Sequence, residues 1–241
     1  MQETKLYLLP NSLDPNNFDK NLFPANLGSI VSDLNGIFVE DEKIARKYLL
    51  QFMDRDEMQK IQMEKLSKYT DENELKEFIS IIRKGGKFGI LSDAGLPCIA
   101  DPGSKLVELA KKNSIQVKSV TGPSSILIAL MLSGFSAQSF VFHGYLPRKI
   151  DMLAKKLAIM EKSASLELFT HVWIEAPYRS DKMLQSCIEI LNPKTLLCAA
   201  ISLTSKDERV ITQPISTWKQ KKIEIGKNPC VFLLAVKPQK K

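Results

Sequence analysis

The sequence predicts an α/β protein of two domains with mixed, mostly parallel sheets. Short runs rich in β-branched and aromatic residues alternate with amphipathic stretches of helical period, which is typical of parallel strands joined by helices. The 241 residues are enough for one large or two modest domains. A second strand-and-helix series begins at Thr121-Gly122-Pro123. We therefore expect an N-terminal domain over 1–120 and a C-terminal domain over 121–241.

In the first half, the strand-like and helix-like runs alternate. The expected strands are Lys5–Leu9, Gly36–Glu40, Lys87–Ser92 and Ile115–Val120, and the expected helices pass through Ile44 and Leu49, over Glu72–Arg83 and over Gly103–Lys112. Residues 54–72 are polar and contain no Gly or Pro. They predict either a mobile excursion or a helix on the surface.

The second half repeats the alternation and then changes. The expected helices are Ser124–Ser133, Ile150–Lys162 and Arg179–Leu191, and the expected strands are Phe140–His143, His171–Glu175, Leu196–Ser202, Glu208–Thr212 and Cys230–Val236. The last strands have no helices between them, and this predicts a mixed sheet.

Composition excludes several classes of protein. A formal net charge of +7 is compatible with an anionic partner such as RNA or a nucleotide, and equally with ordinary surface charge. The four cysteines form no C-x-x-C pair, and there are only two histidines, so we expect no metal site and reduced thiols. Residues 1–10 do not resemble a signal peptide. The apolar run Ile126–Leu132 is far shorter than the roughly 20 residues that span a bilayer. We expect a cytoplasmic protein without a membrane partner.

Several common motifs are absent. No G-x-G-x-x-G follows a strand, and the sequence contains neither a P-loop nor a G-x-S-x-G elbow. An ordinary Rossmann methyltransferase usually has a glycine-rich turn after its first strand. Here that turn is Leu9–Asp14, without a glycine.

The segment Leu91–Gly103 has the densest pattern of chemical groups. It leaves a buried strand and enters a helix with two Asp, two Gly and two Pro residues. Ligands of open α/β sheets bind beyond the carboxyl ends of strands, so Asp93 is placed to accept hydrogen bonds from hydroxyl or ammonium groups. Asp101 precedes Pro-Gly at a helix start, and we interpret it as an N-cap.

Three other segments follow strands, and each has a functional and a structural interpretation. Val120–Ser125 opens a helix and suits either a polar ligand or simple capping. Glu175 ends an apolar strand, where it serves a ligand or pairs with Arg179. His143 is more often a core histidine than a catalytic base at such a position.

These segments together resemble the tetrapyrrole methylase superfamily, whose members use S-adenosylmethionine (SAM). Within that superfamily, the sequence resembles the small-subunit ribosomal RNA cytidine 2′-O-methyltransferase I group. Its signature S-D-A-G-x-P-x-x-x-D-P-G matches 92–103 fully. The G-P-S-S helix start, the S-G-[LF]…F-x-x-x-G-[YF]-L-P run at 133–147 and the E-x-P-[HY]-R element at 175–179 follow in the same order.

The chain departs from that branch at three places. A P-T-P-I-G-N-like first loop is replaced by Pro10-Asn11-Ser12-Leu13-Asp14. In the E-D-T-R element only Glu40-Asp41 remain, and R-E-L-T-K is replaced by Ile201–Ser205. The loss of two basic residues and one acid in the last element affects the expected RNA substrate more than the expected cofactor.

The resemblance implies a homodimer with SAM in a cleft between the two domains. The residues implied to contact SAM are Leu9, Pro10, Asp93, Ala94, Gly95, Ser124, Ser125, Glu175, Leu203, Thr204, Pro229 and Cys230. Those implied to contact the substrate are Glu40, Asp41, Tyr145, Arg148 and Arg179. If RNA is the acceptor, the candidates around the cleft mouth are Arg148, Lys149, Lys155 and Lys156.

Three functions remain open on the sequence alone. The first is methylation of a ribose 2′-hydroxyl in ribosomal RNA. The second is methylation of another acceptor, either a small molecule such as a tetrapyrrole or a protein. The third is SAM binding without catalysis. A ribose acceptor also needs a general base or strong orientation, and no residue is assigned as that base.

Overall fold

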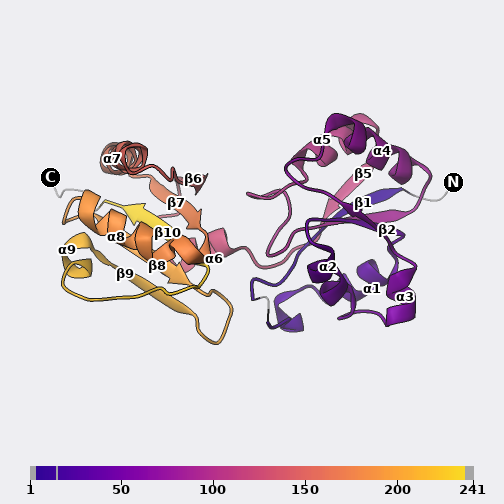
Figure 1. The fold of residues 1–241 in the computed structure, drawn as a ribbon, viewed down its shortest axis with the longest axis horizontal. Coiled ribbons are helices and arrows are strands. Elements are labelled where there is room, and N and C mark those ends of the chain that lie inside the picture. The colour runs from indigo at the N-terminus through magenta and orange to yellow at the C-terminus, as the bar shows by residue number, and fades with distance from the viewer. Residues whose placement is uncertain (1–3, 15, 237–241) are drawn as a thin grey trace. The chain divides into compact units, whose positions relative to one another are not determined.

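The computed structural model describes residues 4–14 and 16–236. The chain divides into two compact units, Met1–Ser124 (unit 1) and Ser125–Lys241 (unit 2), and each is described by itself (Figure 1). The division lies after Ser124 rather than after residue 120, the predicted boundary, since Gly122 still packs against Pro10 of unit 1. Residues 1–3 of the N-terminal segment, in which no signal peptide is expected, lie outside the described residues.

Unit 1 contains a five-stranded sheet in the order β3-β2-β4-β1-β5, with all its pairings parallel. Leu91 of β4 lies opposite Leu9 of β1 and Val39 of β2, so these three strands end at the same level. The strands are β1 (Lys5–Leu9), β2 (Gly36–Val39), β3 (Gln62–Lys65), β4 (Lys87–Leu91) and β5 (Gln116–Ser119).

Helices cover both faces of this sheet (Figure 1). On one face, α1 (Leu27–Ser32), α2 (Glu42–Leu49) and α3 (Arg55–Gln59) bury their apolar sides, and on the other α4 (Glu72–Arg83) and α5 (Ser104–Lys112) do so. A short 3-10 helix, η1, spans Lys20–Leu22. In α4 the buried residues follow helical spacing: Leu75, Phe78, Ile79 and Ile82. Each fully buried side chain of this size contributes about 1.5–3 kcal/mol, so packing rather than propensity holds these helices.

Residues 54–72 correct the prediction for that segment. They form α3, closed by an Asp54–Glu57 capping box, and then β3, the edge strand paired with β2. The strand was not predicted, because Gln62–Lys65 is half exposed and does not alternate apolar and polar residues. Its pairing with the apolar β2 decides its conformation.

Unit 2 contains a five-stranded sheet in the order β6-β7-β10-β8-β9. Only β6 and β7 pair in parallel, and the other three pairings are antiparallel. The strands are β6 (Phe140–Tyr145), β7 (Thr170–Glu175), β8 (Leu196–Ile201), β9 (Arg209–Pro214) and β10 (Cys230–Ala235). With the parallel sheet of unit 1, five of the eight pairings are parallel, and the predicted fold class of mixed, mostly parallel sheets is confirmed.

The second sheet is also covered on both faces. The helices α7 (Ile150–Glu167), α8 (Ser180–Ile190) and α9 (Ile215–Trp218) share one core with Trp173 and Phe232, whose rings stack with centroids 5.5 Å apart. The 3-10 helix η2 (Pro177–Arg179) leads into α8. On the other face lies α6 (Ser125–Ser133), which contacts β7, β8, β9 and β10. No helix within the described ranges is long and apolar enough to cross a membrane.

Candidate functional site

The site in unit 1 lies where β1, β2 and β4 end. Asn11, the second residue after β1, is 6% exposed, and its side-chain nitrogen Nδ2 donates to the carbonyls of Ser92 (3.0 Å) and Asp93 (3.1 Å). Its backbone N–H donates to the carbonyl of Gly95 at 2.7 Å. Three hydrogen bonds therefore fix the loop after β4 to the loop after β1.

Two further hydrogen bonds join the ends of β2 and β4. The carboxylate of Glu40 accepts from the backbone N–H of Asp93, and the carboxylate of Asp93 accepts from the backbone N–H of Asp41. The Asp41 side chain itself caps α2, accepting from Lys43 N at 2.7 Å and from Ile44 N at 3.2 Å. Glu40 and Asp41, which the resemblance implies for the substrate, thus lie beside Asp93, which it implies for the cofactor.

Burial and mutual repulsion raise the pKa values of the carboxyl groups here. Burial, then the charges of Asp101 and Asp93, raises the pKa of Glu40 to about 7. Burial and the charge of Asp41 also raise the pKa of Asp93. The Oε1 atom of Glu40 is buried and has no hydrogen-bond partner among the described residues. Such a polar atom is costly unless a ligand satisfies it.

Asp101 does not cap a helix, so its interpretation as an N-cap is wrong. The N-cap of α5 is Gly103, with a φ of 124°, and no side chain caps this helix. Burial and the charge of Asp93 raise the pKa of Asp101 to about 6, while the Ser92 hydroxyl nearby donates to the carbonyl of Ala94 at 3.2 Å. The Pro-Gly pair lets the chain turn once more before the helix begins, so the Asp101 carboxyl belongs to the Glu40–Asp93 cluster.

Two glycines allow the backbone to approach closely around this edge. Gly95 has a φ of 68°, and an added Cβ would lie 3.1 Å from Cδ2 of Leu13. At Gly122 an added Cβ would lie 2.2 Å from Cβ of Pro10, so the loop after β5 packs directly on the loop after β1. Asp93 and Ala94 remain exposed beside these buried contacts.

The implied residues of unit 2 gather at one edge of its sheet. Cys230 of β10 lies opposite Glu175 of β7 and Ile201 of β8, and the N–H of Ser202 donates to the carbonyl of Pro229 at 3.0 Å. Thr204 has a φ of 65°, which is rare for a β-branched residue. Its hydroxyl is buried and has no hydrogen-bond partner within the described ranges. Because it combines backbone strain with an unsatisfied hydroxyl, Thr204 is the strongest candidate in this group for contact with a ligand.

Glu175 is engaged with Arg179, as one of its two interpretations requires. One carboxylate oxygen lies 3.2 Å from Nη2 of Arg179, with the side chains 0% and 17% exposed. The other oxygen accepts from the N–H of Ala176 at 2.9 Å.

The remaining sequence candidates take different places. Ser124 closes unit 1 and Ser125 begins α6 in unit 2. Tyr145 at the end of β6 and Arg148 before α7 are exposed. His143 lies with its Nε2 atom 2.9 Å from Nδ1 of His171, and burial lowers the pKa of His143 to about 4. A neutral, paired imidazole agrees with a core histidine.

Three features of the site were not predicted from the sequence: the hydrogen bonds of Asn11, the place of Asp101 in the carboxyl cluster, and the unsatisfied Thr204 hydroxyl. A side-chain amide two residues after the end of a strand is the signal that points to Asn11. Within the part of the chain that the structure describes, no group of three or more His, Cys, Asp or Glu side chains is arranged to hold a metal ion.

Solved structures share this fold over nearly the whole chain. The methyltransferase CobJ matches with a TM-score of 0.62 at 14% identity, covering 98% of this chain and 95% of that one. The uroporphyrin III C-methyl transferase from Thermus thermophilus matches with a TM-score of 0.56 at 14% identity, covering 96% and 97%. At this identity the likeness concerns the fold alone.

Curated relatives are more similar in sequence. The Ribosomal RNA small subunit methyltransferase I of Thermotoga maritima is 36% identical over 125 residues, which cover 52% of this chain and 54% of the relative. The protein of that name from Vibrio cholerae is 27% identical over 201 residues, covering 78% and 64%. The chain thus spans between about half and two thirds of the length of these relatives.

The family itself is decided by a broader match. The profile of the Tetrapyrrole (Corrin/Porphyrin) Methylases matches residues 30–218. This range contains the ends of β2 and β4 with the carboxyl cluster, and the strand edge of β7 and β8. The chain belongs to the Tetrapyrrole (Corrin/Porphyrin) Methylases.

Proposed function

We propose that this chain is a SAM-dependent methyltransferase that acts on ribosomal RNA of the small subunit, at a ribose 2′-hydroxyl. The names of the similar curated relatives support the substrate. The observation that supports SAM as the cofactor is the carboxyl cluster of Glu40, Asp93 and Asp101, in which the Oε1 atom of Glu40 is buried and unsatisfied.

SAM fits this cluster chemically. It carries a sulfonium, an ammonium and two ribose hydroxyls, and carboxylates with raised pKa values are stabilised in their charged form by a cation or by hydroxyl donors. When bound, SAM supplies an electrophilic methyl group, so the chain's own residues must orient the acceptor and exclude water. The exposed Asp93 is placed to accept hydrogen bonds, while Asn11 and Gly95 fix the loop that carries it.

The test of this proposal is methyl transfer from tritiated SAM. RNA, protein and small-molecule fractions from a strain that lacks the gene are incubated with the purified chain. We expect label in small-subunit ribosomal RNA. It should stay with the ribose when the base is removed, and it should be found in a 2′-O-methylated nucleoside. Label in the protein or small-molecule fraction, or none in any fraction, overturns the acceptor.

The raised pKa of Glu40 predicts a pH dependence of SAM binding. Because its pKa is about 7 without ligand and a bound cation lowers it, binding releases a proton below pH 7. The affinity for SAM should rise by up to about tenfold per pH unit up to pH 7 and then level off. Calorimetry at several pH values measures this, and Glu40→Gln should flatten the profile. An equal slope in wild type and variant contradicts the assignment.

Homodimer formation and cytoplasmic location also belong to the proposal. The apolar helix α6 leaves Met131 80% exposed, an unusual exposure for a large apolar side chain. The four cysteines are free thiols, as is usual in a reducing compartment. We expect light scattering at micromolar concentration to give twice the chain mass of 27.1 kDa, and the monomer mass contradicts the dimer.

A further inference from the structure

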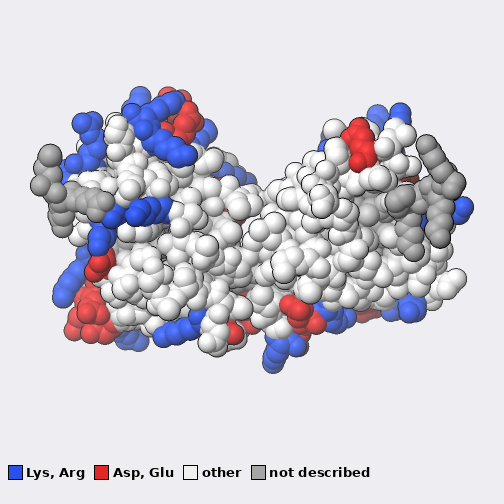
Figure 2. Space-filling model, turned by 180° about the vertical axis from the view of Figure 1, so that it is seen from behind, with Lys and Arg blue, Asp and Glu red and all other residues white. Residues whose placement is uncertain are grey.

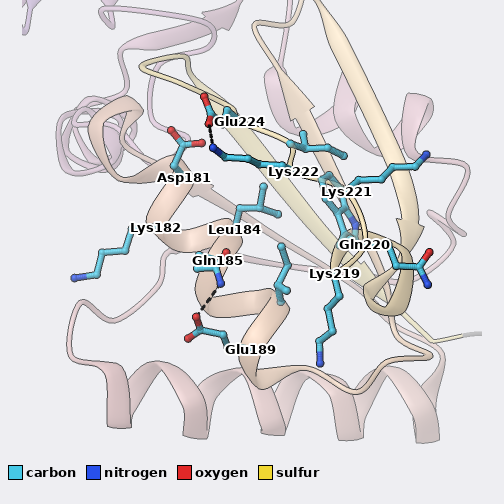
Figure 3. Close-up of a pocket in the computed structure, with 13 residues that line it drawn as sticks. Asp181, Lys182, Leu184, Gln185, Glu189, Lys219, Gln220, Lys221, Lys222 and Glu224 are labelled. Carbon is cyan, nitrogen blue, oxygen red and sulfur yellow. Dashed lines mark hydrogen bonds and ion pairs between the residues drawn. The ribbon is translucent and has the colours of Figure 1, made fainter.

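Lysine and arginine side chains are not spread evenly over the chain. Wide areas of the face shown in Figure 2 carry no charged side chain. In unit 2, by contrast, lysines gather around an open groove of about 1050 Å³ between α8 and the segment Trp218–Glu224 (Figure 3). We call it the α8 groove. It belongs wholly to unit 2 and shares no residue with the carboxyl cluster of unit 1.

The floor of the α8 groove is apolar and its rim is charged. Leu184 and Ile188 of α8 form the floor with Trp218 and Ile223. Trp218 is 1% exposed, and its Nε1 donates to the carbonyl of Leu197 at 3.1 Å. The groove therefore presents no exposed aromatic ring on which a base could stack.

The acids of the rim are largely satisfied within the protein. Asp181 accepts from the backbone N–H groups of Ile225 at 2.7 Å and Gly226 at 3.1 Å. Glu189 accepts from Nε2 of Gln185 at 2.8 Å, and Glu224 pairs with Lys222 at 3.4 Å.

The other rim lysines have no such partner. Among the described residues Lys182, Lys219 and Lys221 form no ion pair, and all three are exposed. Figure 3 shows their ammonium groups extending away from the Lys222–Glu224 and Gln185–Glu189 contacts. The groove is lined by four lysines and three acids, and the three lysines without an ion pair stand on both of its walls. This small positive excess with unpaired ammonium groups suits a partner with repeated negative charges.

We propose that the α8 groove binds the sugar-phosphate backbone of the substrate RNA. The inference rests on the proposed function for the identity of the polyanion. Lys182 stands on one wall while Lys219 and Lys221 stand on the other, and their ammonium groups extend outward in different directions (Figure 3). Each of them therefore contacts a different phosphate of a strand that crosses the groove. Without a stacking platform, this contact is independent of base sequence and positions the RNA.

The test uses the full chain and transcribed small-subunit ribosomal RNA. The triple variant Lys182→Gln, Lys219→Gln, Lys221→Gln is compared with a control, Lys60→Gln, Lys76→Gln, Lys84→Gln, which removes the same charge from unit 1. We expect the groove variant to bind RNA about tenfold or more weakly near 100 mM salt and to lose roughly 2–3 from the slope of log K against log salt. The control should change neither by more than about twofold.

Methyl transfer separates this inference from the proposed function. The groove variant should raise KM for RNA and keep kcat and SAM affinity, because it touches no residue of the carboxyl cluster. If wild-type chain binds and methylates RNA and the groove variant does so with the same KM and salt slope, the groove inference is overturned and the proposed function stands. If wild-type chain neither binds nor methylates RNA, both fall. Equal weakening by the control variant also overturns the groove as the contact.

Discussion

Arg179→Ala should lower the free energy of unfolding of unit 2 by about 3–5 kcal/mol, because it leaves the Glu175 carboxylate buried without its cation. The Glu175 side chain is 0% exposed and its partner only 17%, so the carboxylate depends on the guanidinium rather than on solvent for its stabilisation. Both tryptophans of the chain, Trp173 and Trp218, are buried in unit 2, and their fluorescence in a urea titration reports this unit alone.

A double variant decides which role Glu175 has. Arg179→Met with Glu175→Gln leaves no buried charge and keeps an acceptor for the N–H of Ala176, so most of the lost stability should return. Unchanged SAM affinity in this double variant assigns Glu175 to the structure, and a large loss assigns it to the cofactor. A loss of less than about 1 kcal/mol in Arg179→Ala means that the pair behaves like a surface ion pair.

Asp93→Asn should weaken SAM binding by about 1–3 kcal/mol, which is roughly 5- to 150-fold in Kd. The amide oxygen can still accept from the N–H of Asp41, so the link between the ends of β2 and β4 survives while the charge is lost. The melting temperature should stay the same or rise slightly, because repulsion toward Asp101 disappears. Calorimetry and a thermal scan of the same samples measure both.

Asp33→Asn is the matched control. Asp33 pairs with Lys87, the first residue of β4, at the opposite end of the strands, and the side chains are 59% and 37% exposed. The control should change neither affinity nor melting by more than a few tenths of a kcal/mol. If Asp93→Asn lowers the melting temperature and leaves SAM affinity intact, Asp93 only holds the turn.

The apolar periodicity made most elements predictable. Helix α4 has the predicted bounds because its buried residues repeat at helical spacing between Asp71 and the Gly85-Gly86 pair. The edge strand β3 lacks such a pattern, since its conformation depends on a partner distant in sequence. Elements with a strong local pattern can be predicted from the sequence, and conformations that depend on a neighbouring strand cannot.

The candidate site was predictable in part for a similar reason. Asp93 and Gly95 follow a clear strand and carry a recognisable pattern. Asp101 was misassigned because one capping pattern fits two backbone paths, and only the fold places its carboxyl beside Glu40. Asn11 was overlooked because its hydrogen bonds reach residues 81 and 82 positions away.

The strand orders of the two sheets imply different times of completion as the chain leaves the ribosome. In unit 1 every strand is synthesised by Ser119, although β1 waits for β4 before it gains a neighbour. In unit 2 the last described strand, β10, lies in the middle and joins β6-β7 to β8-β9. While β10 is still inside the ribosome and β6 to β9 have left it, the chain has a unit 1 with all its described strands and a unit 2 in two separate pieces. The unpaired edges of β7 and β8 are then open to wrong partners until β10 emerges.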